Sequence, residues 1–252
     1  MKIKVCTWNL HAGLDPDFKP KFQESVALLK NIKPDLIGLQ ECTKGKHSWS
    51  QDFGFMGEIL SKELNMNFFW CPTISNTFGN LALVRKDIEI VKAVDVQLPW
   101  KPIRSLSHAV KRILSFKVPL NEKRHAILMY LNLNGFKFKF INTHLGLSKD
   151  ERIKQSKKLL EICLSDGLPT LLVGDFNEPI SGEAVKILLD RGLNEISRVY
   201  PELNLYTFPS NKPTVKIDHI FFTNHFKLVN FEVISSNSSD HLPLVATLEV
   251  AT

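Results

Sequence analysis

Short apolar runs separated by polar segments recur along nearly the whole chain. Runs of this kind, rich in β-branched and aromatic residues, are typical of β-strands. They predict strands over the segments 3–8, 35–40, 68–74, 80–84, 112–118, 126–133, 136–143, 169–176, 217–223 and 242–250. Asn134-Gly135 lies between two of these runs and indicates a hairpin, because a type I′ turn requires a positive φ at both central residues. Part of the sheet structure is therefore expected to be antiparallel.

Apolar residues at helical spacing, with charges on the opposite face, appear elsewhere. They predict helices over 22–32, 153–163 and 185–189. Ser181 and Glu183 are expected to open the last of these helices and Gly192 to close it. The predicted strands outnumber the helices, and a continuous apolar run such as 171–173 must be covered on both faces. The pattern therefore favours an α/β fold of layered sheets flanked by helices.

Length and composition are those of an ordinary globular chain. With 252 residues, 44% hydrophobic and 23% charged, it is long enough to bury a sizeable core, and neither a linker nor a repeat divides it. We expect one domain over residues 1–252, present as a monomer. No apolar stretch is long enough to cross a bilayer, the N-terminus lacks a secretion signal, and the cysteines lie far apart. A cytoplasmic location is the simplest expectation.

Acidic, amide and imidazole side chains repeatedly mark the ends of the apolar runs. Asn, Glu, His and Asp follow four predicted strands, and Asp or Asp-His precedes two more, at Asn9, Glu41, His144, Asp175, Asn177, Asp218, Asp240 and His241. Strand ends of a mixed sheet gather at one edge, where ligands bind in open α/β folds. These side chains are therefore expected to share one pocket.

A shared pocket would bring four carboxylates together beside apolar surface. Like charges in a partly dry site are costly unless cations or protons balance them. Carboxylate and amide oxygens suit Mg²⁺ or Mn²⁺, whereas Zn²⁺ prefers more histidine or cysteine. The expected cofactor is Mg²⁺, or else Mn²⁺. Taken singly, each of these residues is equally typical of a turn or a solvated strand end. For five other histidines we expect only this structural role: His11, His47, His108, His125 and His225.

Six short motifs then occur in a fixed order, from residue 7 to residue 245. They are Thr7-Trp8-Asn9, Leu39-Gln40-Glu41, Thr143-His144-Leu145, Gly174-Asp175-Phe176-Asn177, Ile217-Asp218-His219-Ile220 and Ser239-Asp240-His241. In this order they resemble the motif set of the endonuclease/exonuclease/phosphatase superfamily. The resemblance implies a four-layer α/β sandwich, in which two mixed β-sheets pack face to face with helices on the outside.

The same resemblance implies roles for individual residues. It places Glu41 as the principal metal ligand with Asn9 and Asp240 close to the same ion. Asp175 and Asn177 would orient the attacking water and the phosphate, or hold a second ion. His241, oriented by Asp218, would contact the scissile phosphate, and His144 would donate a hydrogen bond or proton to it. Two further residues, Asn80 and Arg112, would contact the substrate.

Local departures from the family pattern narrow the comparison. Glu178-Pro179-Ile180-Ser181 follows the Asp-x-Asn element, where inositol-polyphosphate phosphatases and tyrosyl-DNA phosphodiesterases place an arginine. Lys111 precedes Arg112, where many relatives carry an acid. The chain is most similar to the small bacterial-type hydrolases of the superfamily, with deadenylase-like nucleases next.

Three hypotheses about function follow, and the net charge of +6 favours the first of them. A mild basic excess favours a polyanionic partner, so the first is a metal-dependent phosphodiesterase acting on nucleic acid, whose presumed cleft is flanked by Lys44, Lys46, Lys101, Arg104, Lys111 and Arg112. The second is a phosphatase or phosphodiesterase acting on a small phosphorylated molecule or a phospholipid head group, with a membrane-surface contact through Trp100–Arg104. The third, ranked last, is a non-catalytic binding module.

Overall fold

Two six-stranded sheets form the centre of the molecule. The computed structural model describes residues 1–47, 50–100, 122–200, 203 and 205–251. Within them, the first sheet has the order β11-β12-β1-β2-β4-β3 and the second the order β5-β6-β7-β8-β10-β9. The first is built from β1 (Lys2–Asn9), β2 (Leu36–Thr43), β3 (Met66–Ile74), β4 (Phe78–Arg85), β11 (Phe226–Val233) and β12 (Leu244–Val250). The second is built from β5 (Glu89–Gln97), β6 (His125–Leu133), β7 (Phe136–His144), β8 (Thr170–Asp175), β9 (Asn194–Glu195) and β10 (Asp218–Phe222).

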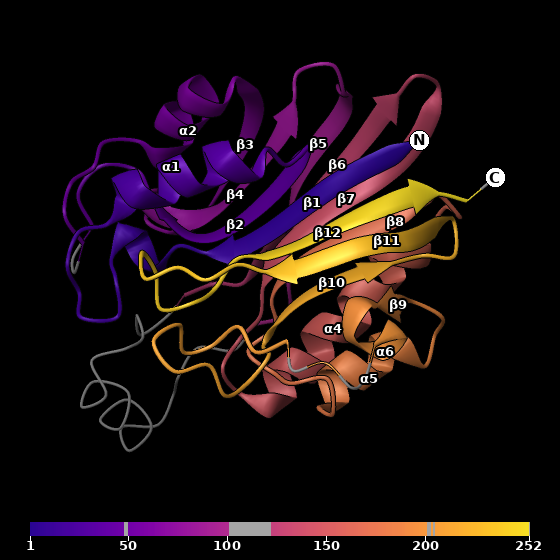
Figure 1. The fold of residues 1–252 in the computed structure, drawn as a ribbon. Coiled ribbons are helices and arrows are strands. Elements are labelled where there is room, and N and C mark those ends of the chain that lie inside the picture. Colours follow the sequence, from indigo (N-terminus) through magenta and orange to yellow (C-terminus); the bar gives the residue numbers. More distant parts are fainter. Residues whose placement is uncertain (48–49, 101–121, 201–202, 204, 252) are drawn as a thin grey trace.

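Both sheets are mixed, and this sets which strand ends meet. In the first sheet β1 runs parallel to β2 and antiparallel to β12. In the second, β7 runs parallel to β8, and β10 is antiparallel to β8. The strands β1, β2, β7 and β8 therefore end, and β10 and β12 begin, at the same edge of the sandwich, away from the N-terminus in Figure 1. The predicted hairpin at Asn134-Gly135 is confirmed, because both residues have positive φ and β6 pairs with β7 across them.

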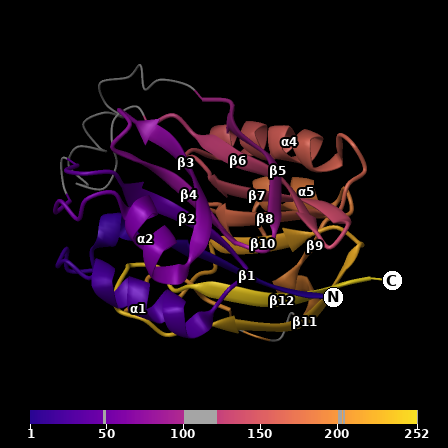
Figure 2. The ribbon, with the colours of Figure 1, turned by 90° about the horizontal axis from the view of Figure 1, so that it is seen from above.

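Helices cover the outer face of each sheet, which completes four layers (Figures 1 and 2). α1 (Phe22–Ile32) and α2 (Met56–Leu64) pack against the first sheet, and α4 (Lys149–Leu164) and α5 (Glu183–Leu189) pack against the second. A 3-10 turn, η1 (His11–Gly13), and the short α6 (Ile196–Val199) are the remaining elements in the part of the chain that the structure describes. A third apolar core lies between the two sheets, distinct from the two cores beneath the helices, because alternate residues of each strand face inward. The predicted four-layer α/β sandwich is confirmed.

Some elements differ from the sequence prediction. β5 and β11 were not expected, because both are edge strands whose many charged residues interrupt the apolar pattern. α2 was missed as well, and α5 begins at Glu183 after an N-cap Gly182, so Ser181 does not open it. The predicted strand over 112–118 lies outside the described residues. Across the described part of the chain, no helix has both the length and the apolar character needed to span a membrane.

A buried polar bridge joins the sheets just behind the strand ends. Asn142 of β7 donates its amide hydrogens to the carbonyl oxygens of Leu39 (2.9 Å) and Leu81 (3.0 Å). Its own side-chain oxygen accepts a hydrogen bond from the Gln40 amide at 2.7 Å. Gly38 makes this approach possible, because a Cβ there would lie 2.5 Å from the Val173 side chain and 2.8 Å from Asn142 Oδ1. The two sheets are therefore held in one register at this edge.

Replacing Asn142 with alanine is expected to lower the free energy of unfolding by about 2–4 kcal/mol, because three buried hydrogen bonds are lost at once. Chemical denaturation monitored by circular dichroism measures the change. The control is Asn67→Ala, at an exposed position of β3, which is expected to cost less than about 1 kcal/mol. Equal losses for the two variants would contradict the bridging role of Asn142.

Candidate active site

The polar residues at the strand ends come together where the two sheets meet. Asn9 is the last residue of β1, and Glu41 lies in β2 at a register shift between Leu39 and Cys42. At this bulge Glu41 has a φ of 54°, so its side chain is turned out of the regular alternation. The Asn9 amide donates to Glu41 Oε1 and to Asp175 Oδ2, both at 3.1 Å. One asparagine thus connects carboxylates of the two sheets.

Asp175 ends β8 and is almost completely buried. Its Oδ1 accepts a hydrogen bond from the backbone N–H of Asn177 at 2.8 Å, and its Oδ2 lies 3.5 Å from His144 Nε2 and 3.7 Å from His241 Nε2. Burial raises its pKa from 3.8 to about 6, against the opposing effect of His241. A carboxylate with this pKa can hold or release a proton near neutral pH.

His241 and Asp218 form a buried ion pair. His241 Nδ1 lies 2.9 Å from Asp218 Oδ2, and the Trp8 indole N–H donates to the His241 carbonyl at 2.9 Å. Burial by itself would lower the pKa of His241, but Asp218 and Asp175 outweigh it and raise that pKa well above 6.5. The ring is therefore an imidazolium at neutral pH, with Nε2 directed toward Asp175.

His144 has the opposite electrostatic character. Burial, with contributions from Arg124 and His241, lowers its pKa well below 6.5, so the ring is neutral. The Asn177 amide lies 3.1 Å from His144 Nε2 and donates to the Leu145 carbonyl at 3.0 Å. This network assigns the ring proton to Nδ1, an atom that is buried without a hydrogen-bond partner among the described residues. His144 can therefore donate a hydrogen bond as a neutral ring, which the low pKa favours over donation of a proton.

A second buried network holds the loop that carries Asn177. Glu195 binds Lys216 Nζ at 2.5 Å, and that ammonium lies 2.9 Å from His219 Nδ1. His219 Nε2 contacts the carbonyl oxygen of Glu178 at 2.9 Å. The residue after Asn177 is thus tied to β10, the strand that begins with Asp218.

The two substrate residues implied by the resemblance are placed differently. Asn80 is buried in β4, and its amide donates to the His125 carbonyl of β6 at 3.2 Å. It therefore bridges the sheets beside the cluster and forms no described hydrogen bond with Asn9, Glu41 or Asp175. Arg112 lies outside the described residues.

Sequence reasoning missed an ion pair at the border of the site. Arg124 Nη1 lies 3.0 Å from Glu122 Oε1, and both side chains are buried. Glu122 raises the pKa of Glu41, and Arg124 lowers that of His144. His11, also given an ordinary reading, lies 3.8 Å from Asp240 Oδ1. The only signal for the pair was an acid and a base two residues apart before a strand, which is common on protein surfaces.

The sequence profile of the Endonuclease/Exonuclease/phosphatase family matches residues 6–241. The chain belongs to this family. Members of the family hydrolyse phosphate esters and generally use a divalent metal ion.

Individual members of the family extend over the same length. The uncharacterized protein YbhP of Escherichia coli (strain K12) is 25% identical over 266 residues, which span 98% of this chain and 96% of that protein. The crystal structure of a family member from Bacteroides vulgatus has a TM-score of 0.77 at 18% identity and covers both chains completely. A mannosyl-6-phosphatase from Bacteroides thetaiotaomicron has a TM-score of 0.72 at 19% identity, covering 99% of this chain and 100% of its own.

The donors around Glu41 fit the divalent ion that the family implies. Burial, Asp240 and Glu122 raise the pKa of Glu41 to about 8, and among the described residues the opposing effects of Asn9 and His241 do not offset them. Asp240 Oδ1 is buried with no hydrogen-bond partner in the described part of the chain. Oxygen donors in this state suit Mg²⁺ or Mn²⁺. Asp175, Asp218 and His241 also lie within 4.8 Å of one another, but there the imidazolium supplies the positive charge.

Mg²⁺ affinity is expected to rise with pH, because Glu41 in the metal-free protein is protonated below its pKa of about 8 and must lose that proton to bind an ion. The increase should be up to roughly tenfold per pH unit below that pKa, and should level off above it. Calorimetric titrations in two buffers of different ionisation enthalpy measure both the affinity and the released proton. In Glu41→Gln the released proton should disappear, and a pH-independent affinity in the unmodified protein would contradict the assignment.

Proposed function

We propose that the protein is a divalent-metal-dependent phosphodiesterase that acts on nucleic acid. The observation that carries the proposal is the meeting of Asn9, Glu41, Asp175 and the Asp218–His241 pair at one edge of the sandwich. Carboxylate, amide and imidazolium groups in this arrangement supply the three requirements of phosphate-ester hydrolysis: charge neutralisation, an oriented water and assistance to the leaving oxygen.

Glu41, Asn9 and Asp240 would hold the ion, Mg²⁺ or Mn²⁺. When bound, it polarises the phosphate and acidifies water. Asn9 orients both neighbouring carboxylates through its two 3.1 Å hydrogen bonds, so their positions do not depend on the ion alone. Preorganised ligands of this kind lower the cost of reaching the productive geometry.

Asp175 orients the attacking water and accepts its proton. Its pKa of about 6 leaves it ionised at neutral pH yet basic enough to take up a proton during the reaction. The Asn9 amide and the Asn177 backbone N–H each occupy one of its oxygens and hold the carboxylate in place. Asp175 therefore acts from a fixed position rather than from a mobile side chain.

His241 and His144 bind the phosphate in complementary ways. The His241 imidazolium, held by Asp218, neutralises the charge that develops on the phosphate, since charge-assisted hydrogen bonds are the stronger ones. Neutral His144, whose Nε2 accepts a hydrogen bond from the Asn177 amide and lies 3.5 Å from Asp175 Oδ2, lines the phosphate side of the site. The two histidines carry different charges, because burial and Arg124 lower the pKa of His144, whereas Asp218 and Asp175 raise that of His241.

A nucleic-acid substrate is supported by the net charge of +6 and by the basic segment after β2. Lys44 and Lys46 are exposed and lie three and five residues after Glu41, and Lys44 Nζ lies 4.9 Å from the centre of the Phe55 ring. Exposed lysines near a phosphoesterase site favour a substrate whose phosphate backbone continues beyond the scissile phosphate, as in nucleic acid. The other basic residues assigned to the cleft, Lys101, Arg104, Lys111 and Arg112, lie outside the described residues.

A phosphatase acting on a small phosphorylated molecule is the second candidate. Its support is the fold shared with the mannosyl-6-phosphatase from Bacteroides thetaiotaomicron over nearly the whole chain. A panel of single- and double-stranded DNA, RNA, sugar phosphates and phospholipids, assayed with Mg²⁺ or Mn²⁺, separates the two. Exclusive release of phosphate from sugar phosphates would favour the second candidate.

Asp175→Asn is expected to lower kcat by about 10²–10⁴-fold, because the amide cannot accept the proton of the attacking water. The variant should fold normally, since an amide preserves the size of the side chain. Turnover of a phosphodiester substrate measures the loss, and thermal unfolding confirms the fold. Asp17→Asn, at an exposed position, serves as the matched control. Unchanged turnover in Asp175→Asn would remove this residue from the mechanism.

Affinity for single-stranded DNA is expected to fall as salt rises, because each lysine–phosphate contact releases counterions. A double-logarithmic plot of affinity against salt should lose about 0.7 of its slope for each contact removed, in Lys44→Gln and in Lys46→Gln. Lys157→Gln, exposed on α4, is expected to leave the slope unchanged. Affinity that does not respond to salt would contradict binding through the phosphate backbone.

A further inference from the structure

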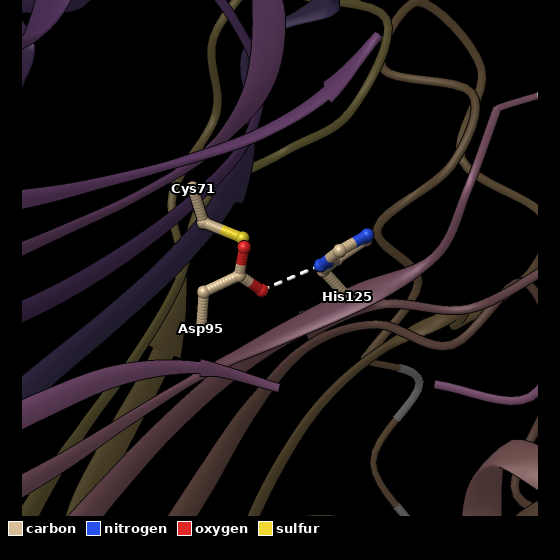
Figure 3. A group of neighbouring side chains, drawn as sticks. All are labelled: Cys71, Asp95 and His125. Carbon is tan, nitrogen blue, oxygen red and sulfur yellow. Dashed lines mark hydrogen bonds and ion pairs between the residues drawn. The ribbon is translucent and has the colours of Figure 1, made fainter. Parts of the chain in front are cut away.

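Three potential metal ligands lie together beside the proposed active site, at the same edge of the sandwich. Cys71 comes from β3 in the first sheet, whereas Asp95 and His125 come from β5 and β6 in the second. Figure 3 shows the Asp95 carboxylate between the Cys71 sulfur and the His125 ring. The sequence predicted no functional role for His125, because Cys71 and Asp95 are distant from it along the chain.

The spacing of the three donors matches a small metal ion. One ligand atom from each residue lies within 4.8 Å of the other two. Donors of a tetrahedral zinc site lie about 2.0–2.3 Å from the ion, which places them roughly 3–4 Å apart. His125 Nδ1 and Asp95 Oδ1 are hydrogen-bonded at 2.5 Å, so an ion would replace that bond and move the two groups slightly apart. No strand has to shift to create the site.

The chemistry of the group argues against a catalytic cysteine. A nucleophilic cysteine needs a histidine or another cation beside its sulfur to stabilise the thiolate. Here burial raises the pKa of the Cys71 thiol, and the neighbouring Asp95 carboxylate raises it further. A bound cation reverses this effect, because coordination removes the thiol proton and leaves a thiolate. The arrangement is therefore suited to metal binding and unsuited to nucleophilic attack.

We propose that Cys71, Asp95 and His125 bind a Zn²⁺ ion through one sulfur, one oxygen and one nitrogen atom. On binding, the Cys71 thiol proton is released to solvent, and water completes the coordination. The mixed donor set selects zinc over the Mg²⁺ expected at the all-oxygen site around Glu41. An ion can enter from solvent, since the side chain of Asp95 is 37% exposed and that of His125 is 12% exposed.

The zinc site would connect the two sheets next to Asn80, for which the family resemblance predicts a substrate contact. Cys71 pairs in register with Asn80 in the neighbouring strand β4. The backbone carbonyl of His125 accepts hydrogen bonds from Asn80 (3.2 Å) and from Thr143 Oγ1 (3.3 Å), and Thr143 precedes His144. An ion on these ligands thus holds Asn80 and the end of β7 in fixed relation. Neither Cys71 nor Asp95 contacts the Asn9–Asp175 cluster through any described hydrogen bond, so the ion would act on that cluster only through the strands that carry Asn80 and Thr143.

Cobalt titration of the metal-free protein tests the proposal. Co²⁺ reports thiolate ligation through a sulfur-to-metal charge-transfer absorption that oxygen-only sites do not produce. We expect this absorption to saturate at one Co²⁺ per chain, to disappear on addition of Zn²⁺, and to persist in Glu41→Gln. Asp95→Asn, at an exposed position, and Cys71→Ser should each weaken Zn²⁺ binding at least tenfold, measured by competition with a chromophoric chelator.

Matched controls separate the site from general effects on the fold. Glu89→Gln changes another acid of β5, and Cys163→Ala removes a buried thiol from α4; both should retain the absorption and the Zn²⁺ affinity. Thermal unfolding confirms that each variant is folded. If Cys71→Ser does not fold, the comparison of Asp95→Asn with Glu89→Gln decides the test. Absence of the charge-transfer absorption in the unmodified protein, or equal Zn²⁺ affinity in Asp95→Asn and Glu89→Gln, would overturn the proposal.

Discussion

The two hydrogen bonds donated by the Asn9 amide connect the sheets at the point where their carboxylates gather. One joins Glu41 in the first sheet, and the other joins Asp175 in the second. The Asn142–Gln40 bridge lies directly behind and sets the register of the same edge. Because buried polar groups must find partners, these bonds allow only one relative placement of the sheets. The site depends on that placement, since neither sheet alone supplies a complete set of groups.

Charge balance in the site follows from which groups face each other. Asp218 keeps His241 protonated, whereas Arg124 and burial keep His144 neutral. Burial, Asp240 and Glu122 raise the pKa of Glu41 to about 8, because among the described residues the opposing effects of Asn9 and His241 are smaller. Two identical imidazoles and two kinds of carboxylate thus acquire different properties within one pocket. A division of roles of this kind is typical of enzymes that combine proton transfer with charge stabilisation.

The proposed zinc group shows a different use of the same architecture. The edge of the sandwich at which β1, β2, β7 and β8 end also brings β3, β5 and β6 together. At one part of this edge the proposed ligands are the side-chain oxygens of Asn9, Glu41 and Asp240, and at another the sulfur, oxygen and nitrogen of Cys71, Asp95 and His125 meet. Donor chemistry therefore divides the edge into a centre suited to a hard cation and a neighbouring group suited to a softer one.

Local sequence determined the strand-rich α/β pattern, the Asn134-Gly135 hairpin and the polar residues at the strand ends. These follow from nearest neighbours along the chain: alternating apolar positions, positive φ at an Asn-Gly turn, and polar groups at the end of a buried run. The order of the six motifs also indicated the family, and with it the four-layer sandwich. Edge strands such as β5 were not predicted, because charged residues on their exposed faces obscure the alternation of apolar and polar positions.

Only the tertiary structure decided which side chains meet and in what state of charge. The Glu122–Arg124 pair and the Cys71–Asp95–His125 group consist of residues whose sequence context is ordinary, and packing of the two sheets brings them to the site. The pKa of a group depends on its burial and on charges within a few ångströms, and most of those charges come from distant parts of the chain. Sequence thus specified the chemical groups available, and the face-to-face packing of the sheets set their protonation and their partners.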